Sequence, residues 1–365
     1  RVLFRSGGVW LWLGAAAFFV VSILADLGGD AYQARPDRPQ RMLLEGLLLT
    51  APPMVLVMLA GMLLYAASPG TPAALLADRL GLPRADTGWL GLMGLVVATG
   101  QLSGAAAVSF GHDLIHRRSH ASWLMGELIL ARCLNPALGI EHLSGHHAHV
   151  GTCKDPSTAP RGMGFWRYAP RDVVLTFRNA ARHEAGRLRR HGHSAWSWRN
   201  RLLQGIAMAA GLLALAGVSA GVGGLASFVA SALVAQSVIE LTNYVSHYGL
   251  VRAEGTPIEP RHSWNAPHFF STSAMANAQR HSHHHAAPGA PFWNLSVMED
   301  GAFYPHNAGA MCILALFPPI WFRFTAPLLD DWDRHLASTA ERTLTSRQVC
   351  RSAVAGDKDT ARQAG

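Results

Sequence analysis

The chain has 365 residues, of which 50% are hydrophobic and only 15% are charged; about 25% charged residues is usual in a soluble domain. This composition excludes an ordinary soluble globular protein. The formal net charge of +8 does not indicate nucleic-acid binding, because the arginines flank long uncharged segments and no motif of stacking aromatic residues accompanies them.

The uncharged segments predict five transmembrane helices, since a membrane span needs about 20 predominantly apolar residues. Helices of soluble proteins carry a polar stripe that these segments lack. The expected spans, in chain order, are residues 7–26, 46–67, 88–110, 202–219 and 225–245. The last two belong to one uncharged run with Gly221, Gly223 and Gly224 near its middle, so we expect a helical hairpin that turns at these glycines.

Three further segments complete the expected organisation. Residues 122–140 are apolar but contain Glu127 and Arg132, which predicts a short in-plane or re-entrant helix. Residues 301–322 form another apolar stretch, broken by prolines, that we expect to pack against the domain outside the membrane. A single membrane domain over residues 1–335 is then followed by a polar tail, 336–365, that is expected to be disordered.

The positions of the arginines predict which loops face the cytoplasm. Arginines lie between the first two spans, and ten more lie between Arg161 and Arg201; cytoplasmic loops carry such an excess. The ends of the third and fifth spans share that face. Because the first residue is Arg, not Met, and the chain would start on the opposite face, we also expect that one upstream span is missing from this sequence.

Seventeen of the nineteen histidines lie between residues 112 and 285, in or near four short motifs. The motifs cover residues 112–116, 141–147, 243–250 and 279–285. Nine histidines of these motifs are the candidate metal ligands: His112, His116, His142, His146, His147, His247, His281, His284 and His285. Nine imidazoles are too many for one ion, so they predict a centre of two metal ions.

The spacing of these histidines predicts how they are shared. Residues four apart lie on one face of a helix, so His112 and His116 should bind one ion together, as should His142 and His146. Neighbours in sequence point about 100° apart on a helix, so the pairs 146/147 and 284/285 should each serve both ions. Imidazole binds Zn, Cu, Fe or Ni, so the spacing alone leaves the metal open.

The alternative is that these histidines form a solvated basic face or cap helices, which we disfavour because all four motifs lie at the edges of the expected spans. For other histidines this alternative is preferred. We expect surface positions or ordinary hydrogen bonds for a second set: His183, His191, His193, His262 and His335.

With their flanks, the four motifs resemble the integral-membrane alkane 1-monooxygenases and the related xylene and cymene methyl-hydroxylases, with fatty acid desaturases as more distant relatives. The matching flanks include Gly145-His146-His147 with Asp155-Pro156-Ser157, Asn243-Tyr244 with His247-Tyr248-Gly249-Leu250, His262-Ser263-Trp264-Asn265 with His268, and Gln279-Arg280-His281-Ser282. The resemblance covers roughly residues 1–335. It implies an all-α integral membrane protein, a bundle of transmembrane helices with a cytoplasmic histidine-rich cap that holds two irons.

Carried over position by position, the resemblance implies that all nine candidate histidines are iron ligands. This chain departs from the family beside them, with Asp113, Ser246 and His283 where the family often has Glu, Glu and Asp. Such carboxylates orient ligand imidazoles. The residues expected to support the ligands here are therefore Asp113, Glu141, Asp155, Glu240, His268 and His283.

The resemblance also implies the reaction: O2-dependent hydroxylation of the terminal methyl group of an n-alkane by two non-haem iron ions, with O2 as co-substrate. The partners it implies are a hydrophobic substrate from the lipid phase and rubredoxin or a ferredoxin-type electron donor with its reductase. The enzyme would be a multi-pass protein of the bacterial inner membrane with its active site facing the cytoplasm. The arginine-rich 161–201 region either docks an acidic partner or is a plain cytoplasmic loop.

Three alternatives remain open at this point. The nearest is the same reaction on an aromatic methyl group, and the next is desaturation of an acyl chain. A metal transporter without enzymatic activity is disfavoured, because its histidines would line a path at mid-membrane, whereas these cluster at span ends.

Overall fold

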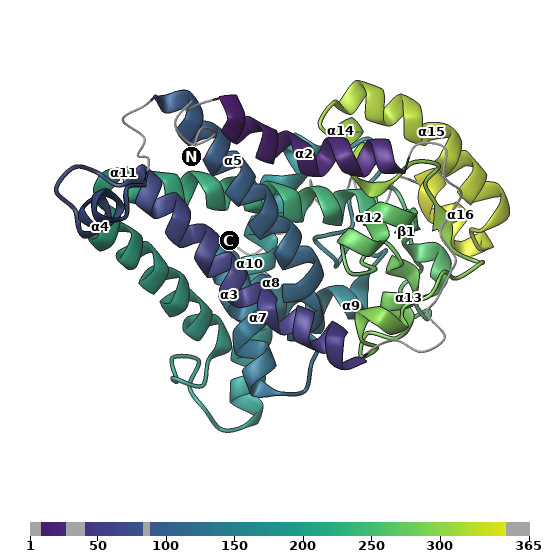
Figure 1. The fold of residues 1–365 in the computed structure, drawn as a ribbon. Helices are drawn as coiled ribbons and strands as arrows, with labels where there is room; N and C mark the ends of the chain where they lie inside the picture. Colours follow the sequence, from purple (N-terminus) through teal and green to yellow (C-terminus); the bar gives the residue numbers. More distant parts are fainter. Residues whose placement is uncertain (1–8, 27–40, 83–87, 348–365) are drawn as a thin grey trace, which may run out of the picture.

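The computed structural model describes residues 9–26, 41–82 and 88–347. These residues form helices almost throughout; the strands among them are β1 (Trp264–Asn265) and β2 (Ala302–Phe303), which pair in parallel. Figure 1 shows a bundle of long helices on one side and, on the other, a lobe of short helices from the C-terminal part of the chain.

The long apolar helices are α2 (Val9–Ala25), α3 (Arg41–Ala66), α5 (Trp89–Ala106) and α11 (Arg201–His247). Three segments, Arg41–Ala66, Trp89–Ile115 and Arg201–His247, are long and apolar enough to cross a membrane. Large apolar side chains point outward from them, among them Val57, Val218 and Leu233, which are 71%, 77% and 61% exposed. Outward apolar faces suit lipid surroundings, so the chain is a helical membrane protein.

Helix α11 is a hairpin, as the glycines near its middle predict. Gly221 interrupts it with φ 66° and ψ −158°, a conformation open to glycine but strained for other residues. The short helix α4 (Pro72–Leu80) lies at this turn, and the Ser68 N–H donates to the Ala220 carbonyl (2.9 Å). The two legs of α11 therefore run in opposite senses, and the second one ends at His247.

Glycines bring α5 against the second leg of α11. A Cβ at Gly100 would lie 2.6 Å from the Ser231 carbonyl oxygen, and one at Gly104 would lie 2.7 Å from that of Ala235. Small residues four apart allow this close approach in membrane helices. The contact holds the C-terminal half of α5, which continues through residues 107–111 to His112, against the second leg of α11.

The remaining helices surround these two ends. They are, in chain order, η2 (Ala107–Gly111), α6 (His112–Ile115), α7 (His120–Arg132), α8 (Leu138–Glu141), η3 (His142–His146), α9 (His147–His149), α10 (Phe165–Arg190), η4 (Pro260–His262), α12 (Phe269–Ala274), α13 (His281–Ala286), η5 (Phe292–Asn294), α14 (Ala308–Ala315), α15 (Pro318–His335) and α16 (Thr339–Arg347).

Residues 301–322, expected to pack against the cap, form β2, α14 and the start of α15. The buried Trp321 ring lies 5.4 Å from the ring of Tyr244 and 5.3 Å from that of Tyr248. This segment therefore packs on the last turns of α11. The Asp26 carboxylate, after α2, also ties α12 in place by accepting the N–H groups of Phe270 (2.8 Å) and Ser271 (3.1 Å).

The expectation of a disordered tail from residue 336 is wrong for residues 339–347, which form helix α16. The reason is one buried carboxylate. Glu341 accepts hydrogen bonds from His262 Nε2 (2.8 Å) and Arg261 Nε (3.1 Å), and this long-range pairing holds an otherwise polar helix against η4. Residues 348–365 of the expected tail lie outside the described residues.

Candidate metal centre

The structure brings all nine candidate histidines together in two adjacent groups. The ligand nitrogens within each group all lie within 4.8 Å of one another. The five-histidine group is His112, His116, His142, His147 and His284. The four-histidine group is His146, His247, His281 and His285. The predicted division of the adjacent pairs 146/147 and 284/285 between two sites therefore matches the geometry.

The expectation that His142 and His146 serve the same ion is wrong. They belong to different groups because residues 142–146 form the π-helix η3 instead of an α-helix. In a π-helix the wider turn aligns residues five apart. His142 Nε2 accordingly lies 2.9 Å from His147 Nε2, and His146 turns toward the other group.

A second π-helix, η2, ends immediately before His112. His112 and His116 do share a group, as their spacing predicts, and His112 Nε2 lies 2.7 Å from His142 Nε2. Single π-turns inside helices occur frequently at functional sites. Here each of them re-aims ligands that a regular α-helix would place elsewhere.

The ring nitrogens converge at distances that suit metal ions. Further Nε2–Nε2 separations are 3.0 Å for His147–His284, 2.9 Å for His247–His281 and 3.1 Å for His281–His285. Two nitrogens bound to one ion at about 2.1 Å each lie roughly 3–3.5 Å apart. A neutral imidazole has only one N–H, so these rings cannot all satisfy one another by hydrogen bonds, whereas a cation satisfies every converging lone pair.

Burial keeps most of these rings neutral, which metal binding requires. Burial lowers the pKa of His284 and His142 well below its ordinary value. Burial, with the nearby His146, lowers the pKa of His116 to about 4, that of His281 to about 3 and that of His147 to about 2. The residues present therefore fit two metal ions, one in each group.

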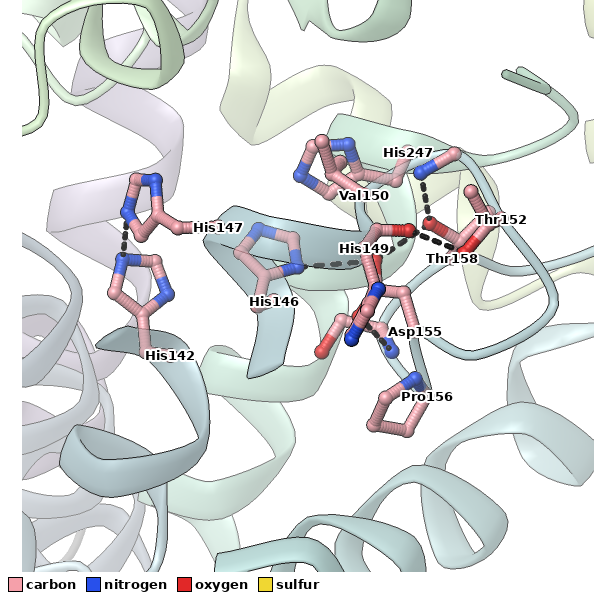
Figure 2. A network of polar contacts seen from close by, with 12 residues as sticks. His142, His146, His147, His149, Val150, Thr152, Asp155, Pro156, Thr158 and His247 are labelled. Carbon is pink, nitrogen blue, oxygen red and sulfur yellow. Dashed lines mark hydrogen bonds and ion pairs between the residues drawn. The ribbon is translucent and has the colours of Figure 1, made fainter. Parts of the chain in front are cut away.

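His146 is the exception, because a carboxylate faces it. Its Nδ1 lies 3.0 Å from Asp155 Oδ2, as Figure 2 shows. Burial would lower the pKa of His146, but the charge of Asp155 raises it. Asp155 is itself held by the Thr158 hydroxyl (2.6 Å) and the Ser157 N–H (3.1 Å). This arrangement leaves Nε2 of His146 to the metal site.

Backbone carbonyls orient two other rings of the four-histidine group. His247 Nδ1 lies 3.4 Å from the His262 carbonyl oxygen, and His281 forms a hydrogen bond with the Ala278 carbonyl. Sequence reasoning missed these contacts, because a carbonyl acceptor has no residue type by which it can be recognised. His262, expected to be at the surface or in an ordinary hydrogen bond, is fully buried and hydrogen-bonded on both sides.

Among the described residues, the hydrogen bonds of the other three predicted carboxylates go to groups other than the nine imidazoles, so their supporting role stays a prediction. Asp113 accepts from Arg117 Nη2 (2.7 Å) and the Phe292 N–H (2.9 Å). The charge of Arg117 attracts this carboxylate away from the rings.

Glu141 and Glu240 likewise have other partners. Glu141 accepts from Asn179 Nδ2 (3.2 Å) and lies 3.3 Å from His183 Nε2, and burial raises its pKa to about 7. Glu240 accepts from Gln236 Nε2 (2.6 Å) and shares a hydrogen bond with Asp172.

The two predicted supporting histidines also lie outside both groups. His283 Nδ1 accepts from the backbone N–H and the hydroxyl of Ser296, both at 2.8 Å. His268 is buried at the start of α12, where its carbonyl accepts the Thr272 N–H (3.0 Å). Their contacts hold the loops around α13 and α12.

A cavity adjoins both histidine groups. Its volume is about 60 Å³, and it is lined by His112, His142 and His284 of one group and by His146 and His281 of the other. A neighbouring cavity of about 80 Å³ lies between α5, α11, α12 and α14 and also reaches His281. Apolar side chains such as Val108 line both cavities, so the space beside the two groups suits a hydrophobic molecule.

Comparison with known proteins identifies the family of the chain. The fatty acid desaturase family matches residues 87–311. Alkane 1-monooxygenase 1 of Pseudomonas aeruginosa is 35% identical over 241 residues, which cover 65% of this chain and 63% of that protein. Alkane 1-monooxygenase 2 of the same organism is 34% identical over 240 residues, covering 64% and 63%.

A third relative aligns over more of the chain. The hydroxylase component of xylene/toluene monooxygenase from Pseudomonas putida is 30% identical over 345 residues, which cover 93% of this chain and 88% of that protein. The chain thus spans about 63% of the length of the two alkane monooxygenases and most of the xylene/toluene hydroxylase.

Proposed function

The chain belongs to the alkane monooxygenase branch of the fatty acid desaturase family, and on this premise we propose that it hydroxylates the terminal methyl group of an n-alkane in an O2-dependent reaction. The reaction converts the alkane, O2, two electrons and two protons into a primary alcohol and water. The observation that carries the proposal is the pair of converging histidine groups beside an apolar cavity.

We propose iron in both groups, held by the five-histidine set on one side and the four-histidine set on the other. Imidazole alone also accepts zinc, copper or nickel, so the choice of iron rests on the family. When bound, the irons supply the oxidation of an unactivated C–H bond, which no side chain can supply.

The side chains of this chain have three tasks in that reaction. The π-turns aim the imidazoles, and Asp155 fixes the ring of His146 through its 3.0 Å contact. The apolar walls around His281, formed by residues such as Val108 and Ile239, bind the hydrocarbon and exclude water. An alkane is dissolved in the lipid phase already, so entry between the helices needs no aqueous path.

The partners follow from the same reaction. Two electrons must arrive from outside, and we propose rubredoxin or a ferredoxin-type protein with its reductase as their source. We also propose that the protein resides in the bacterial inner membrane with the histidine groups on the cytoplasmic side, in agreement with the arginine-rich connection of residues 161–201 on that side.

A second candidate function is hydroxylation of an aromatic methyl group. The two cavities measure about 60 and 80 Å³, and a cavity of about 150 Å³ in another protein holds benzene. The xylene/toluene hydroxylase also aligns with this chain over 93% of its length. A compact aromatic substrate would fit this space with less rearrangement than a long chain.

Metal content and product analysis test the proposal together. Purified protein in detergent should hold about two irons per chain and convert n-octane to 1-octanol when supplied with electrons. His284→Ala should lose iron and activity, whereas His283→Ala, one residue away but outside both groups, should keep both irons. Conversion of p-xylene alone would favour the second function. Bound zinc, or no metal in folded protein, would contradict the di-iron proposal.

A further inference from the structure

A basic cleft of about 260 Å³ shares no lining residue with the two cavities beside the histidine groups. The side chains that form it come from η3, α10 and the start of α11: Ser144, Arg182, His183, Arg187, Arg190 and Arg201. Ser144 lies midway in sequence between His142 and His146 and is exposed. It therefore faces outward, whereas those two histidines face the metal groups. The basic cleft and the hydrocarbon cavity thus approach the histidines from different sides.

The basic cleft carries uncompensated positive charge. Arg187 and Arg201 are bound to the buried Glu184, at 2.6 and 3.0 Å, which fixes their positions. Arg182 and Arg190 are exposed and form no ion pair within the described part of the chain. No acidic side chain of the described residues lines the cleft. Four guanidinium groups over one carboxylate leave a surface that attracts an anionic partner.

One short contact path leads from the basic cleft to the metal groups. His183, in its wall, lies 3.3 Å from the Glu141 carboxylate, and Asn179 holds the other oxygen of Glu141 at 3.2 Å. Glu141 is bonded to His142, a member of the five-histidine group. A single turn of backbone therefore separates this surface from the candidate ligands.

We propose that the basic cleft is the docking site of an acidic one-electron carrier protein, and that His183 and Glu141 position the point of electron entry. This inference rests on the proposed function, whose reaction consumes two electrons for each O2. A one-electron carrier must therefore dock twice per turnover. A shallow, charged and readily dissociating contact suits this task, because electrostatic attraction speeds encounter.

Exposed aromatic residues beside the basic cleft extend the surface that a protein partner can contact. Trp196 and Trp198 are 84% and 78% exposed. The Arg199 guanidinium lies 5.4 Å from the Trp198 ring, and the Arg199 carbonyl accepts from Arg187 of the cleft (2.8 Å). Tryptophan and arginine are enriched at the centres of protein interfaces.

The double variant Arg182→Glu/Arg190→Glu tests the docking site, since neither arginine supports Glu184. With an acidic rubredoxin as donor, the KM for the donor should rise at least about tenfold, and its dependence on salt should weaken. The matched control is Arg167→Glu, an exposed arginine on the same helix that lies about 22 Å from Arg182 along the helix axis and farther from Arg190. The control should keep the wild-type KM.

A single-turnover assay separates docking from chemistry. Protein reduced anaerobically with dithionite, freed of reductant and mixed with O2 and n-octane should form the same amount of alcohol in the wild type and the double variant. An unchanged KM for the donor in the double variant would overturn the docking proposal. The proposal would also be overturned if the double variant no longer bound anionic lipid vesicles but kept the wild-type kinetics with the donor. Absence of product from the reduced wild type would instead remove the proposed function itself.

Discussion

Asp155→Asn is the sharpest test of how this site is built. The variant keeps an amide oxygen that can accept from His146 Nδ1, but it removes the negative charge that lies 3.0 Å from that nitrogen. Hydrogen bonds to a charged group contribute about 1.5–3 kcal/mol, and loss of such supporting partners weakens metal affinity by about 10- to 100-fold. Because a neutral acceptor remains, we expect about a tenfold loss, or about 1.4 kcal/mol.

The loss should be confined to one metal. Among the nine histidines, His146 belongs to the four-histidine group, so that site should weaken while the five-histidine site keeps its affinity. Competition with a chelator measures the affinities, and Mössbauer spectroscopy of the iron-loaded protein tells the two sites apart. Asp155→Ala, which also leaves the Thr158 hydroxyl and the Ser157 N–H without this acceptor, should approach the 100-fold limit.

Asp113→Asn is the matched control, because Asp113 also adjoins a candidate ligand in sequence but binds Arg117 and the Phe292 N–H. It should leave both metal affinities within about twofold of the wild type. We expect a direct contact with the imidazole to decide the loss of metal affinity. This expectation would be refuted if Asp155→Asn weakened both metal sites equally, or if Asp113→Asn lowered metal affinity as much as Asp155→Asn does.

Three further predictions concern the frame that holds the site. Gly104→Val should lower the free energy of unfolding in detergent by about 1–3 kcal/mol, because its Cβ would lie 2.7 Å from the Ala235 carbonyl oxygen. Gly211→Val is the control: a Cβ there meets no atom within 4 Å, so this variant should keep the wild-type free energy of unfolding. Asp26→Ala should cost about 0.5–2 kcal/mol through loss of the cap on α12, seen as a lower midpoint and faster proteolysis near residue 270; an unchanged midpoint would contradict the cap. Burial would raise the pKa of Glu341, but His262, Arg261 and the Ser338 N–H lower it to about 2. The ionised carboxylate therefore stabilises the fold at pH values above its unfolded-state pKa, near 4.5. This stabilisation is lost as the pH falls from about 4.5 toward 2. The stability difference between wild type and Glu341→Gln should accordingly shrink over that pH range, and a difference that stays constant would show that the charge is not responsible.

The sequence predicts the long helices well because their signal is local. An uncharged run broken by glycines is enough to place the hairpin of α11, and Gly221 indeed adopts the positive φ at its turn. Part of the convergence of the nine histidines has the same origin, because the motifs at 112–116 and 243–250 end or follow those helices. Apolar runs and short spacings are properties of contiguous residues, so one sequence contains them in full.

Details that depend on distant partners could not be predicted in this way. Helix α16 looks like a polar tail until Glu341 meets His262, 79 residues away. His183 reads as a surface residue until α10 packs against α8 and brings it to Glu141. The assignment of His142 and His146 to one ion failed for a different reason. It assumed an α-helix, and the π-turn of η3 depends on how its flanks pack.

The resemblance implies Glu, Glu and Asp at three positions beside the candidate ligands, where this chain has Asp113, Ser246 and His283. Asp113 accepts a hydrogen bond from Arg117, and His283 accepts one from Ser296. Among the described residues, Asp155 is the one carboxylate in contact with any of the nine imidazoles. The other oriented rings, His247 and His281, rely on neutral carbonyls. The carboxylate of Asp155 thus contacts one candidate ligand, His146 of the four-histidine group. If each group holds an iron, as proposed, the two irons should differ in affinity and in reduction potential, and Asp155 should control that difference.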